Sequence, residues 1–208
     1  MLPRLYAIMD AERLGSRSLA GAVDALVSAG VRLIQYRDKR SSSRELYAVS
    51  LKPAETVNRA GGVFIVNDRA DVAWCSGSSG VHLGQSDLPA ALARRMLPSG
   101  MIIGLSTHSL AQVAAADREP VDYIAFGPIF ATASKENPGP VVGLAALAEA
   151  RKATRKPLVA IGGITTENAR TVIDAGADSV AVIGALMSAP DLGERAQEFL
   201  NAVSARGA

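Results

Sequence analysis

Residues 121–141 read VDYIAFGPIFATASKENPGPV. The stretch begins with a short apolar run, 123–126, which has an aromatic residue at either end and predicts a buried strand. A Gly-Pro pair at 127–128 ends that strand, and a polar loop leads to Pro-Gly-Pro at 138–140, which is incompatible with a helix. Hydroxyl and lysine side chains directly after a buried strand predict an anion-binding loop, because they donate hydrogen bonds and supply positive charge. The simpler alternative is an ordinary solvated loop.

The rest of the chain repeats this order of apolar run, polar segment and stretch with helical spacing. Eight apolar runs predict strands, at 5–10, 31–38, 63–68, 80–84, 101–106, 123–126, 157–161 and 178–183. Helices are predicted at 18–29, 44–60, 70–75, 88–97, 110–118, 144–151, 166–175 and 192–203. Pro53 lies inside the second helix and is expected to kink or break it.

Alternating strands and helices produce a parallel sheet, either an open doubly wound sheet or a closed barrel. The count of eight predicted strands favours the barrel, so the sequence predicts an α/β fold of the TIM (β/α)8 type. Residues 1–208 are assigned to this single catalytic domain, with short loops. Polar residues gather after the predicted strands rather than before them, which is where such barrels carry their chemistry.

Gln35, Arg37 and Lys39 alternate along the second predicted strand and therefore point to one face. Inside a barrel these side chains are costly to bury unless they have a partner or an anionic ligand. We predict a clamp for a phosphate or diphosphate, with the Arg37 guanidinium binding as a fork and Lys39 as a point charge. The alternatives are a surface strand end, or a pair between Arg37 and its neighbour Asp38.

Asp68 and Asp87 follow the third and fourth predicted strands. Because neighbouring strands lie about 4.8 Å apart, the two carboxylates are close enough to share one cation. Mg²⁺ binds few protein carboxylates and completes its shell with waters and substrate phosphate oxygens, so the pair fits beside a diphosphate clamp. The alternatives are that Asp87 caps the helix that follows it and that Asp68 pairs with Arg69.

Gly162-Gly163 and Gly184 follow the last two predicted strands, where barrels often bind a phosphate with bare backbone N–H groups. The alternative at the glycine pair is a tight turn.

Of the two histidines, His82 lies within an apolar run and is predicted to be a core residue with its hydrogen bonds satisfied. His108 follows a strand and is a candidate acid or base. Ser106 lacks the spacing of a catalytic triad and is interpreted as a hydrogen-bond donor.

The composition is that of an ordinary soluble globular protein, with 49% apolar and 20% charged residues in 208. A net charge of +2 and 4% aromatic residues argue against nucleic-acid binding. No apolar run approaches the ~20 residues that span a membrane. The single cysteine, Cys75, excludes an internal disulfide, and with no signal peptide recognised we expect a cytoplasmic location.

Several segments, taken together, resemble the thiamine-phosphate synthase (thiamine-phosphate pyrophosphorylase) family. In chain order they are YRDK, VNDRADVA, GVHLGQSDLP, IIGLSTHS, DYIAFGPIFATASKENPGP, LVAIGGIT and AGADSVAVIGAL. The resemblance implies a TIM barrel that uses Mg²⁺. It also implies coupling of 4-amino-5-hydroxymethyl-2-methylpyrimidine diphosphate with 4-methyl-5-(2-phosphoethyl)thiazole, or its carboxylated form, to give thiamine phosphate and pyrophosphate.

The resemblance further implies roles for individual residues. Those it assigns to the pyrimidine diphosphate are Gln35, Arg37, Lys39, Asn67 and Ser106. The metal ligands are Asp68 and Asp87. Those it assigns to the thiazole phosphate are Thr132, Ser134, Gly163, Ile183 and Gly184. Lys135 holds the departing pyrophosphate, and the catalytic set is Arg37, Lys39, Ser106 and Lys135.

Rival functions remain open on the same fold. A thiazole tautomerase paralogue would use His108 and would not need the carboxylate pair. A non-catalytic phosphate-binding barrel would lack the diphosphate clamp, and a phosphosugar isomerase would need a positioned base, which we do not find.

For partners, the sequence predicts small-molecule substrates, with no nucleic acid and no membrane, and leaves a homodimer open. The loop 135–139 is interpreted as a lid because of its polarity and prolines.

Overall fold

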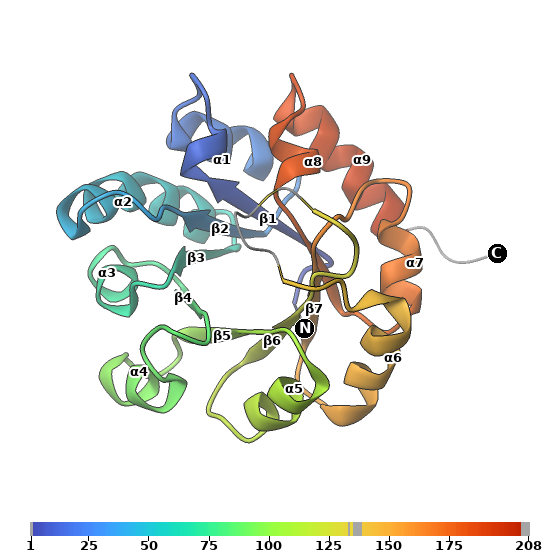
Figure 1. Ribbon diagram of the computed structural model, residues 1–208. Coiled ribbons are helices and arrows are strands. Elements are labelled where there is room, and N and C mark those ends of the chain that lie inside the picture. The colour runs from blue at the N-terminus through green and yellow to red at the C-terminus, as the bar shows by residue number, and fades with distance from the viewer. Residues whose placement is uncertain (1, 133, 135–138, 205–208) are drawn as a thin grey trace.

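The computed structural model describes residues 2–132, 134 and 139–204 of the chain. Its centre is a closed barrel of parallel strands, in which each strand pairs with the next along the sequence (Figure 1). The strands are β1 (Leu5–Asp10), β2 (Leu33–Arg37), β3 (Val63–Asn67), β4 (Gly80–Leu83), β5 (Ile102–Thr107), β6 (Tyr123–Phe126), β7 (Leu158–Ile161) and β8 (Ser179–Val182). The prediction of a closed barrel is confirmed, because β8 pairs in parallel with β1.

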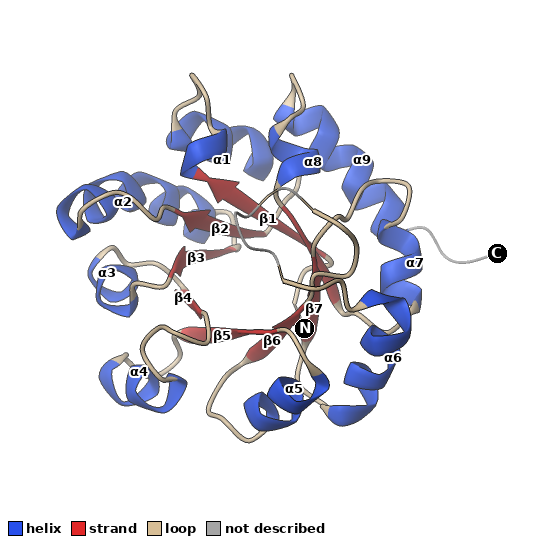
Figure 2. Ribbon diagram, viewed as in Figure 1, coloured by secondary structure: helices blue, strands red, loops and turns tan. Residues whose placement is uncertain are grey.

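Helices surround the barrel on its outer side (Figure 2). They are α1 (Leu19–Ser28), α2 (Ser43–Arg59), α3 (Ala70–Cys75), α4 (Ala90–Met96), α5 (Leu110–Asp117), α6 (Gly143–Ala153), α7 (Ala169–Asp174), α8 (Gly184–Met187) and α9 (Leu192–Ser204), with a short 3-10 helix η1 (Ala11–Arg13). Serine side chains cap the N-termini of some of these helices. Ser18 caps α1, and Ser42 forms a capping box with Glu45 on α2. None of the helices in the described ranges has the length and apolar character needed to cross a bilayer.

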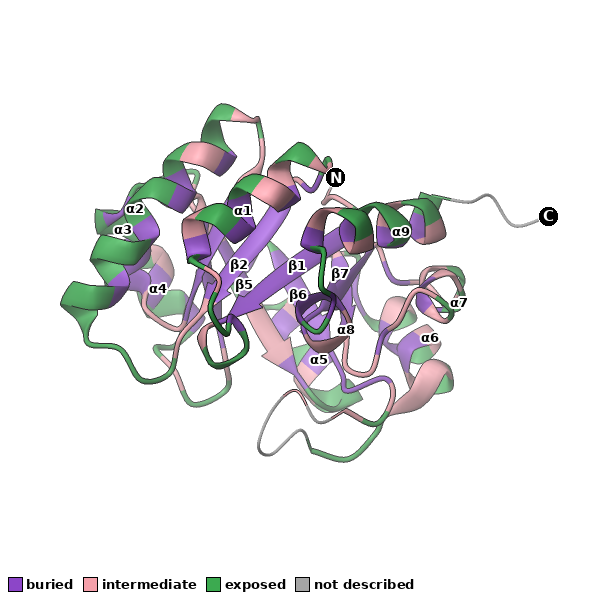
Figure 3. Cartoon of the chain, turned by 90° about the horizontal axis from the view of Figure 1, so that it is seen from above, coloured by how far each residue is buried: buried purple, intermediate pink, exposed green. Residues whose placement is uncertain are grey.

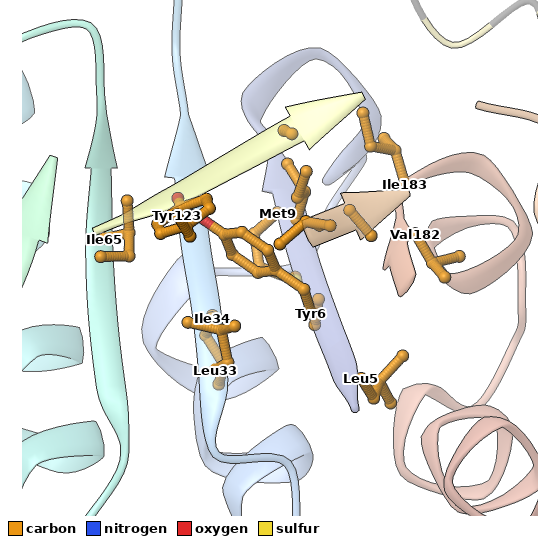
Figure 4. Packing of buried hydrophobic residues seen from close by; sticks show 14 of the residues in the cluster. Leu5, Tyr6, Met9, Leu33, Ile34, Ile65, Tyr123, Val182 and Ile183 are labelled. Atoms are coloured by element: carbon orange, nitrogen blue, oxygen red, sulfur yellow. Dashed lines mark hydrogen bonds between the residues drawn. The ribbon is translucent and has the colours of Figure 1, made fainter. Parts of the chain in front are cut away.

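The strands are buried on both faces, as their continuous apolar runs predict (Figure 3). Every residue of β1, β4, β6 and β8 is buried. Tyr6 on β1 and Tyr123 on β6 are buried in the barrel, and their rings meet edge to face with centroids 5.9 Å apart (Figure 4). Gly104 on β5 makes room for this pair, because a Cβ there would overlap the Tyr123 ring.

Three local predictions were wrong. The helix α2 continues through Pro53, whose buried side chain packs in the core, so packing offsets the lost backbone hydrogen bond. The helix predicted from residue 166 begins at Ala169, because the Thr165 N–H donates to Asn168 Oδ1, 2.9 Å away, in a turn before it. No helix was predicted between 183 and 192, where the structure has the short helix α8.

Replacing Ser50 by alanine is expected to stabilise the protein. Ser50 is fully buried in α2, and its Oγ has no hydrogen-bond partner in the part of the chain that the structure describes. Removing an unsatisfied hydroxyl and gaining helix propensity should raise the free energy of unfolding by about 1–2 kcal/mol, measured by denaturant unfolding. The matched control is Ser76→Ala, which should destabilise, because Ser76 Oγ bonds Ser78 Oγ at 2.7 Å. Equal effects in the two variants would contradict the prediction.

Candidate active site

Two neighbouring cavities lie at the carboxyl ends of the strands. The polar cavity, about 340 Å³, is lined mainly by residues from β1 to β5 and the loops after them. The glycine-lined cavity, about 230 Å³, is lined by residues that follow β5 to β8. The residues that line both cavities are His108, Ile161, Ala181 and Ile183. Two ligands bound in these cavities would therefore be held next to each other.

The predicted clamp residues Gln35, Arg37 and Lys39 all line the polar cavity. Arg37 forms an ion pair with Asp10, a residue that is 2% exposed and is the register partner of Arg37 on β1. The expected alternative pair between Arg37 and Asp38 is wrong. Asp38 instead accepts hydrogen bonds from the Tyr36 hydroxyl and from nearby backbone N–H groups. The guanidinium is thus fixed at the cavity wall by a buried carboxylate.

Asp68 and Asp87 lie together in the polar cavity, as the strand order predicts. Burial raises the pKa of the Asp68 carboxyl, and the contact of Asp68 with Asp87 raises it further. Lys39, which forms an ion pair with Asp68, has the opposite effect on this pKa. Asp87 Oδ2 accepts a hydrogen bond from the Gly84 N–H at 2.6 Å. The cap alternative for Asp87 is therefore wrong, since its carboxylate faces the cavity loop rather than the end of α4.

The alternative pair of Asp68 with Arg69 is also wrong, because Arg69 binds Asp71. Asp68 itself has a φ of 61°, the one left-handed non-glycine residue in the described ranges. Asp tolerates this conformation better than most residues, although at some cost. The strained backbone, the buried carboxylate and the adjacent second carboxylate together mark this corner of the cavity as specialised.

The donor set in this corner fits Mg²⁺. Within the described ranges, no group of three or more His, Cys, Asp and Glu residues is placed to hold a metal. A pair of carboxylates is nonetheless what Mg²⁺ uses when substrate phosphates and waters supply its other ligands. A cation between Asp68 and Asp87 would also relieve the repulsion that raises the Asp68 pKa.

A chain of buried hydrogen bonds crosses the barrel interior below the polar cavity. Gln35 Nε2 donates to the Tyr6 hydroxyl at 2.6 Å, and the Tyr6 and Tyr123 hydroxyls are 2.8 Å apart. His82 contacts the Tyr123 hydroxyl through Nδ1 and Ser106 Oγ through Nε2, both at 2.8 Å. The interpretation of His82 as a satisfied core residue is confirmed, and Ser106 is attached to it.

The glycine-lined cavity brings together the residues predicted to hold the thiazole phosphate: Thr132, Ser134, Gly163, Ile183 and Gly184. Gly163 has a φ of 64°, and a Cβ there would lie 2.5 Å from the Ala131 carbonyl oxygen. A Cβ on Gly184 would lie 2.7 Å from Ser134 Oγ. Glycine at these two positions therefore keeps the cavity wall open and its backbone within reach of a ligand.

The two glycine segments of this cavity differ in how they relate to helices. Gly162-Gly163 does not open a helix directly, because α7 begins only at Ala169. Gly184 does, as the first residue of the unpredicted helix α8. Lys135, the predicted pyrophosphate ligand, lies outside the described residues, as does the proposed lid apart from Gly139.

Sequence reasoning missed Asp10, Tyr6 and Tyr123. The alternation of side chains along β1 could have revealed two of them, because it places Tyr6, Ile8 and Asp10 on one face of that strand. The same alternation places Gln35 and Arg37 on one face of β2.

His108 borders both cavities, and its Nδ1 lies 2.7 Å from the Gly127 carbonyl oxygen. Because a carbonyl accepts, Nδ1 carries the hydrogen in neutral His108.

The chain is similar to known enzymes along nearly its whole length. A family model described as thiamine monophosphate synthase matches residues 5–186. Thiamine-phosphate synthase of Koribacter versatilis is 52% identical over 206 residues, covering 96% of this chain and 95% of the relative. That of Methanoculleus marisnigri is 45% identical over 202 residues, covering 97% and 95%. The structure of thiamine phosphate pyrophosphorylase from Pyrococcus furiosus matches with a TM-score of 0.87 and 34% identity, covering 96% and 95%.

Proposed function

The chain belongs to the thiamine monophosphate synthase family and is a transferase of thiamine biosynthesis, and from this premise we propose how its two cavities divide the substrates. The polar cavity binds the aminopyrimidine diphosphate, and the glycine-lined cavity binds the thiazole phosphate. The observation that carries this proposal is that two different cavities share wall residues. One is lined by cations and carboxylates, and the other by glycines, with no Asp, Glu, Lys or Arg among its described lining residues.

In the polar cavity, Arg37 and Lys39 bind the diphosphate oxygens, and Asn67 adds an amide donor to the same group. Arg37 is held by Asp10 and Lys39 by Asp68, so both cations are oriented before substrate enters. Preorganised positive charge stabilises the negative charge that develops on the leaving diphosphate as its bond to the pyrimidine methylene breaks. Asp68 and Asp87 would hold Mg²⁺, which would supply further positive charge for the leaving diphosphate. Lys135 is assigned to the departing pyrophosphate on the family resemblance alone.

In the glycine-lined cavity, the phosphate of the thiazole is bound by the hydroxyls of Thr132 and Ser134 and by the backbone N–H groups of Gly163 and Gly184. Ile183 contributes to the wall of this cavity and of the polar one. The bond between the pyrimidine methylene and the diphosphate ionises first, and the ring amino group stabilises the cation that remains. The thiazole nitrogen then attacks the methylene carbon with its lone pair, so no general base is needed. The chain accelerates this step by holding the two substrates side by side.

Asp10→Asn is expected to weaken the handling of the pyrimidine diphosphate specifically. The change keeps the shape of the side chain but removes the charge that fixes Arg37. We expect kcat/KM for the pyrimidine diphosphate to fall at least roughly tenfold while KM for the thiazole phosphate changes less than about twofold, measured by steady-state kinetics. The control is Glu12→Gln, which breaks only the exposed pair with Arg40 and should leave both constants unchanged. A selective rise in KM for the thiazole phosphate would contradict the assignment.

The proposal is tested by mixing the protein with both substrates and Mg²⁺ and reading thiamine phosphate as its fluorescent oxidation product. Product formation that stops with a chelator and returns on adding Mg²⁺ is the expected result. Product that is insensitive to the chelator would remove the metal from the proposal. Folded protein that makes no product but isomerises a thiazole carboxylate phosphate would identify the tautomerase, with His108 as its acid or base.

Small-molecule substrates agree with the family. The cytoplasmic location follows from the lone cysteine, which is exposed on the surface, and stays a prediction. A homodimer also stays a prediction, to be checked by sedimentation of the purified chain.

A further inference from the structure

The chain of hydrogen bonds from Gln35 to Ser106 links two side chains that face the polar cavity from strands that are not neighbours in the barrel. Gln35 comes from β2 and Ser106 from β5, and both line the polar cavity. The three residues between them are Tyr6, Tyr123 and His82, of which the tyrosines are 1% and 0% exposed. Burial raises the pKa of both tyrosines, so both remain neutral hydroxyls that donate one hydrogen each.

The direction of every hydrogen bond in this chain follows from its first member. Gln35 donates through Nε2, so the Tyr6 oxygen accepts and its own hydrogen is directed to Tyr123. The Tyr123 hydrogen is then directed to Nδ1 of His82, which leaves the His82 hydrogen on Nε2 as the donor to Ser106 Oγ. Ser106, having accepted, presents its hydrogen to the cavity. Gln35, with one Nε2 hydrogen given to Tyr6, has its carbonyl oxygen left to accept.

We propose that Tyr6, Tyr123 and His82 are positioning residues that fix a complementary pair in the polar cavity, an acceptor on Gln35 and a donor on Ser106, and so select an aminopyrimidine over an oxopyrimidine. This selection rests on the proposed function. A 4-aminopyrimidine offers an N–H donor beside a ring-nitrogen acceptor, which matches the pair. A 4-oxopyrimidine offers the reverse, a carbonyl acceptor beside a ring N–H donor. For Gln35 to meet it with an N–H and Ser106 with a lone pair in the same positions, the Gln35 carboxamide must turn over and each hydrogen bond between them must reverse.

Packing holds these hydrogen-bonded side chains in place. The His82 and Tyr123 rings are stacked with centroids 5.5 Å apart and an interplanar angle of 23°. Gly104 leaves space for the Tyr123 ring, because a Cβ on Gly104 would overlap it. Figure 4 shows Tyr6 reaching toward Tyr123 among the buried apolar side chains. Because Tyr6 and Tyr123 are fully buried, a single misdirected hydrogen bond among these residues is costly, and a local change at either end is resisted by all of them.

The kinetic test compares kcat/KM for the aminopyrimidine diphosphate with that for its 4-oxo analogue, at saturating thiazole phosphate. Tyr123→Phe and Tyr6→Phe each interrupt the chain while preserving the ring, and either should lower the amino-to-oxo ratio roughly tenfold. KM for the thiazole phosphate should stay within about twofold. Tyr36→Phe is the matched control. Tyr36 is a buried tyrosine whose hydroxyl donates to Asp38 and takes no part in the hydrogen bonds from Gln35 to Ser106, so the amino-to-oxo ratio of this variant should equal that of the wild type. An unchanged ratio in both chain variants would overturn the proposal.

A second measurement uses the unaltered protein and needs no turnover. The series of hydrogen bonds from Gln35 to Ser106 requires the hydrogen of His82 to be on Nε2. The hydrogen bond to the Gly127 carbonyl requires the hydrogen of His108 to be on Nδ1. NMR of isotope-labelled imidazole nitrogens should therefore show the two histidines as opposite tautomers. Finding His82 with its hydrogen on Nδ1, or on both nitrogens, would overturn the proposal even if every tyrosine variant failed to fold. If the wild type makes no thiamine phosphate but the tautomers are as expected, the proposed function fails and the chain of bonds stands.

Discussion

Asp87→Asn is expected to lower kcat roughly hundred- to thousandfold without unfolding the protein. Asparagine keeps an oxygen that accepts from the Gly84 N–H, so the loop after β4 retains its anchor. The charge is lost, and with it one of the two carboxylates proposed to hold Mg²⁺ beside the leaving diphosphate. We expect the Mg²⁺ concentration that gives half-maximal rate to rise as well, because one of two anionic ligands is gone. Steady-state kinetics at varied Mg²⁺ measures both effects.

The matched control is Asp71→Asn, which also removes one carboxylate charge. Asp71 is paired with Arg69 on the surface of α3 and lines neither cavity. Its kcat and Mg²⁺ dependence should equal those of the wild type. Full activity and an unchanged Mg²⁺ dependence in Asp87→Asn would reduce Asp87 to a structural anchor of its loop.

Gly163→Ala is expected to disable the thiazole phosphate site. The added Cβ would lie 2.5 Å from the Ala131 carbonyl oxygen and 2.7 Å from Phe130 Cβ, so the loop after β6 must move. That loop carries Thr132 and Ser134, which are proposed phosphate donors. We expect KM for the thiazole phosphate to rise at least roughly hundredfold, since a displacement of about 1 Å in a positioned site is enough for such losses. KM for the pyrimidine diphosphate should change much less.

Gly61→Ala separates the clash from the backbone strain. Gly61 has a φ of 68°, close to the 64° of Gly163, but a Cβ there meets nothing within 4 Å. Both variants carry the cost of a left-handed alanine, about 1 kcal/mol or more of unfolding free energy. Only Gly163→Ala should alter KM for the thiazole phosphate. If the two variants behaved alike in kinetics, the glycine-lined cavity would not be the thiazole phosphate site.

The fold was predictable because periodicity and the count of strands depend on local sequence. The run from Leu5 to Asp10 and the helix from Ala70 to Cys75 have the expected bounds, since an apolar run and its polar flanks define each. The pairing of Asp68 with Asp87 was predictable for a related reason. Consecutive strands of a parallel barrel are neighbours, so their carboxyl ends meet without further information.

The misses concern contacts that depend on three-dimensional packing. Asp10 holds Arg37 only because β1 and β2 pair in a particular register, which the sequence pattern alone left open. Tyr6 and Tyr123 are far apart in the chain and meet across the barrel, where the absence of a side chain at Gly104 admits the ring. Pro53 fits in an unbroken helix because burial outweighs its local penalty. In each case tertiary packing decided what local propensity could not.

The division of the substrates between two cavities is tested most directly by a crystal structure of the protein with Mn²⁺ in place of Mg²⁺, a non-reacting pyrimidine diphosphate analogue and the thiazole phosphate. We expect an anomalous peak from Mn²⁺ between Asp68 and Asp87, in contact with the diphosphate. We also expect the thiazole phosphate to lie against Gly163 and Ser134. A metal bound away from the two carboxylates, or a thiazole phosphate seated on Arg37 and Lys39, would contradict the proposal.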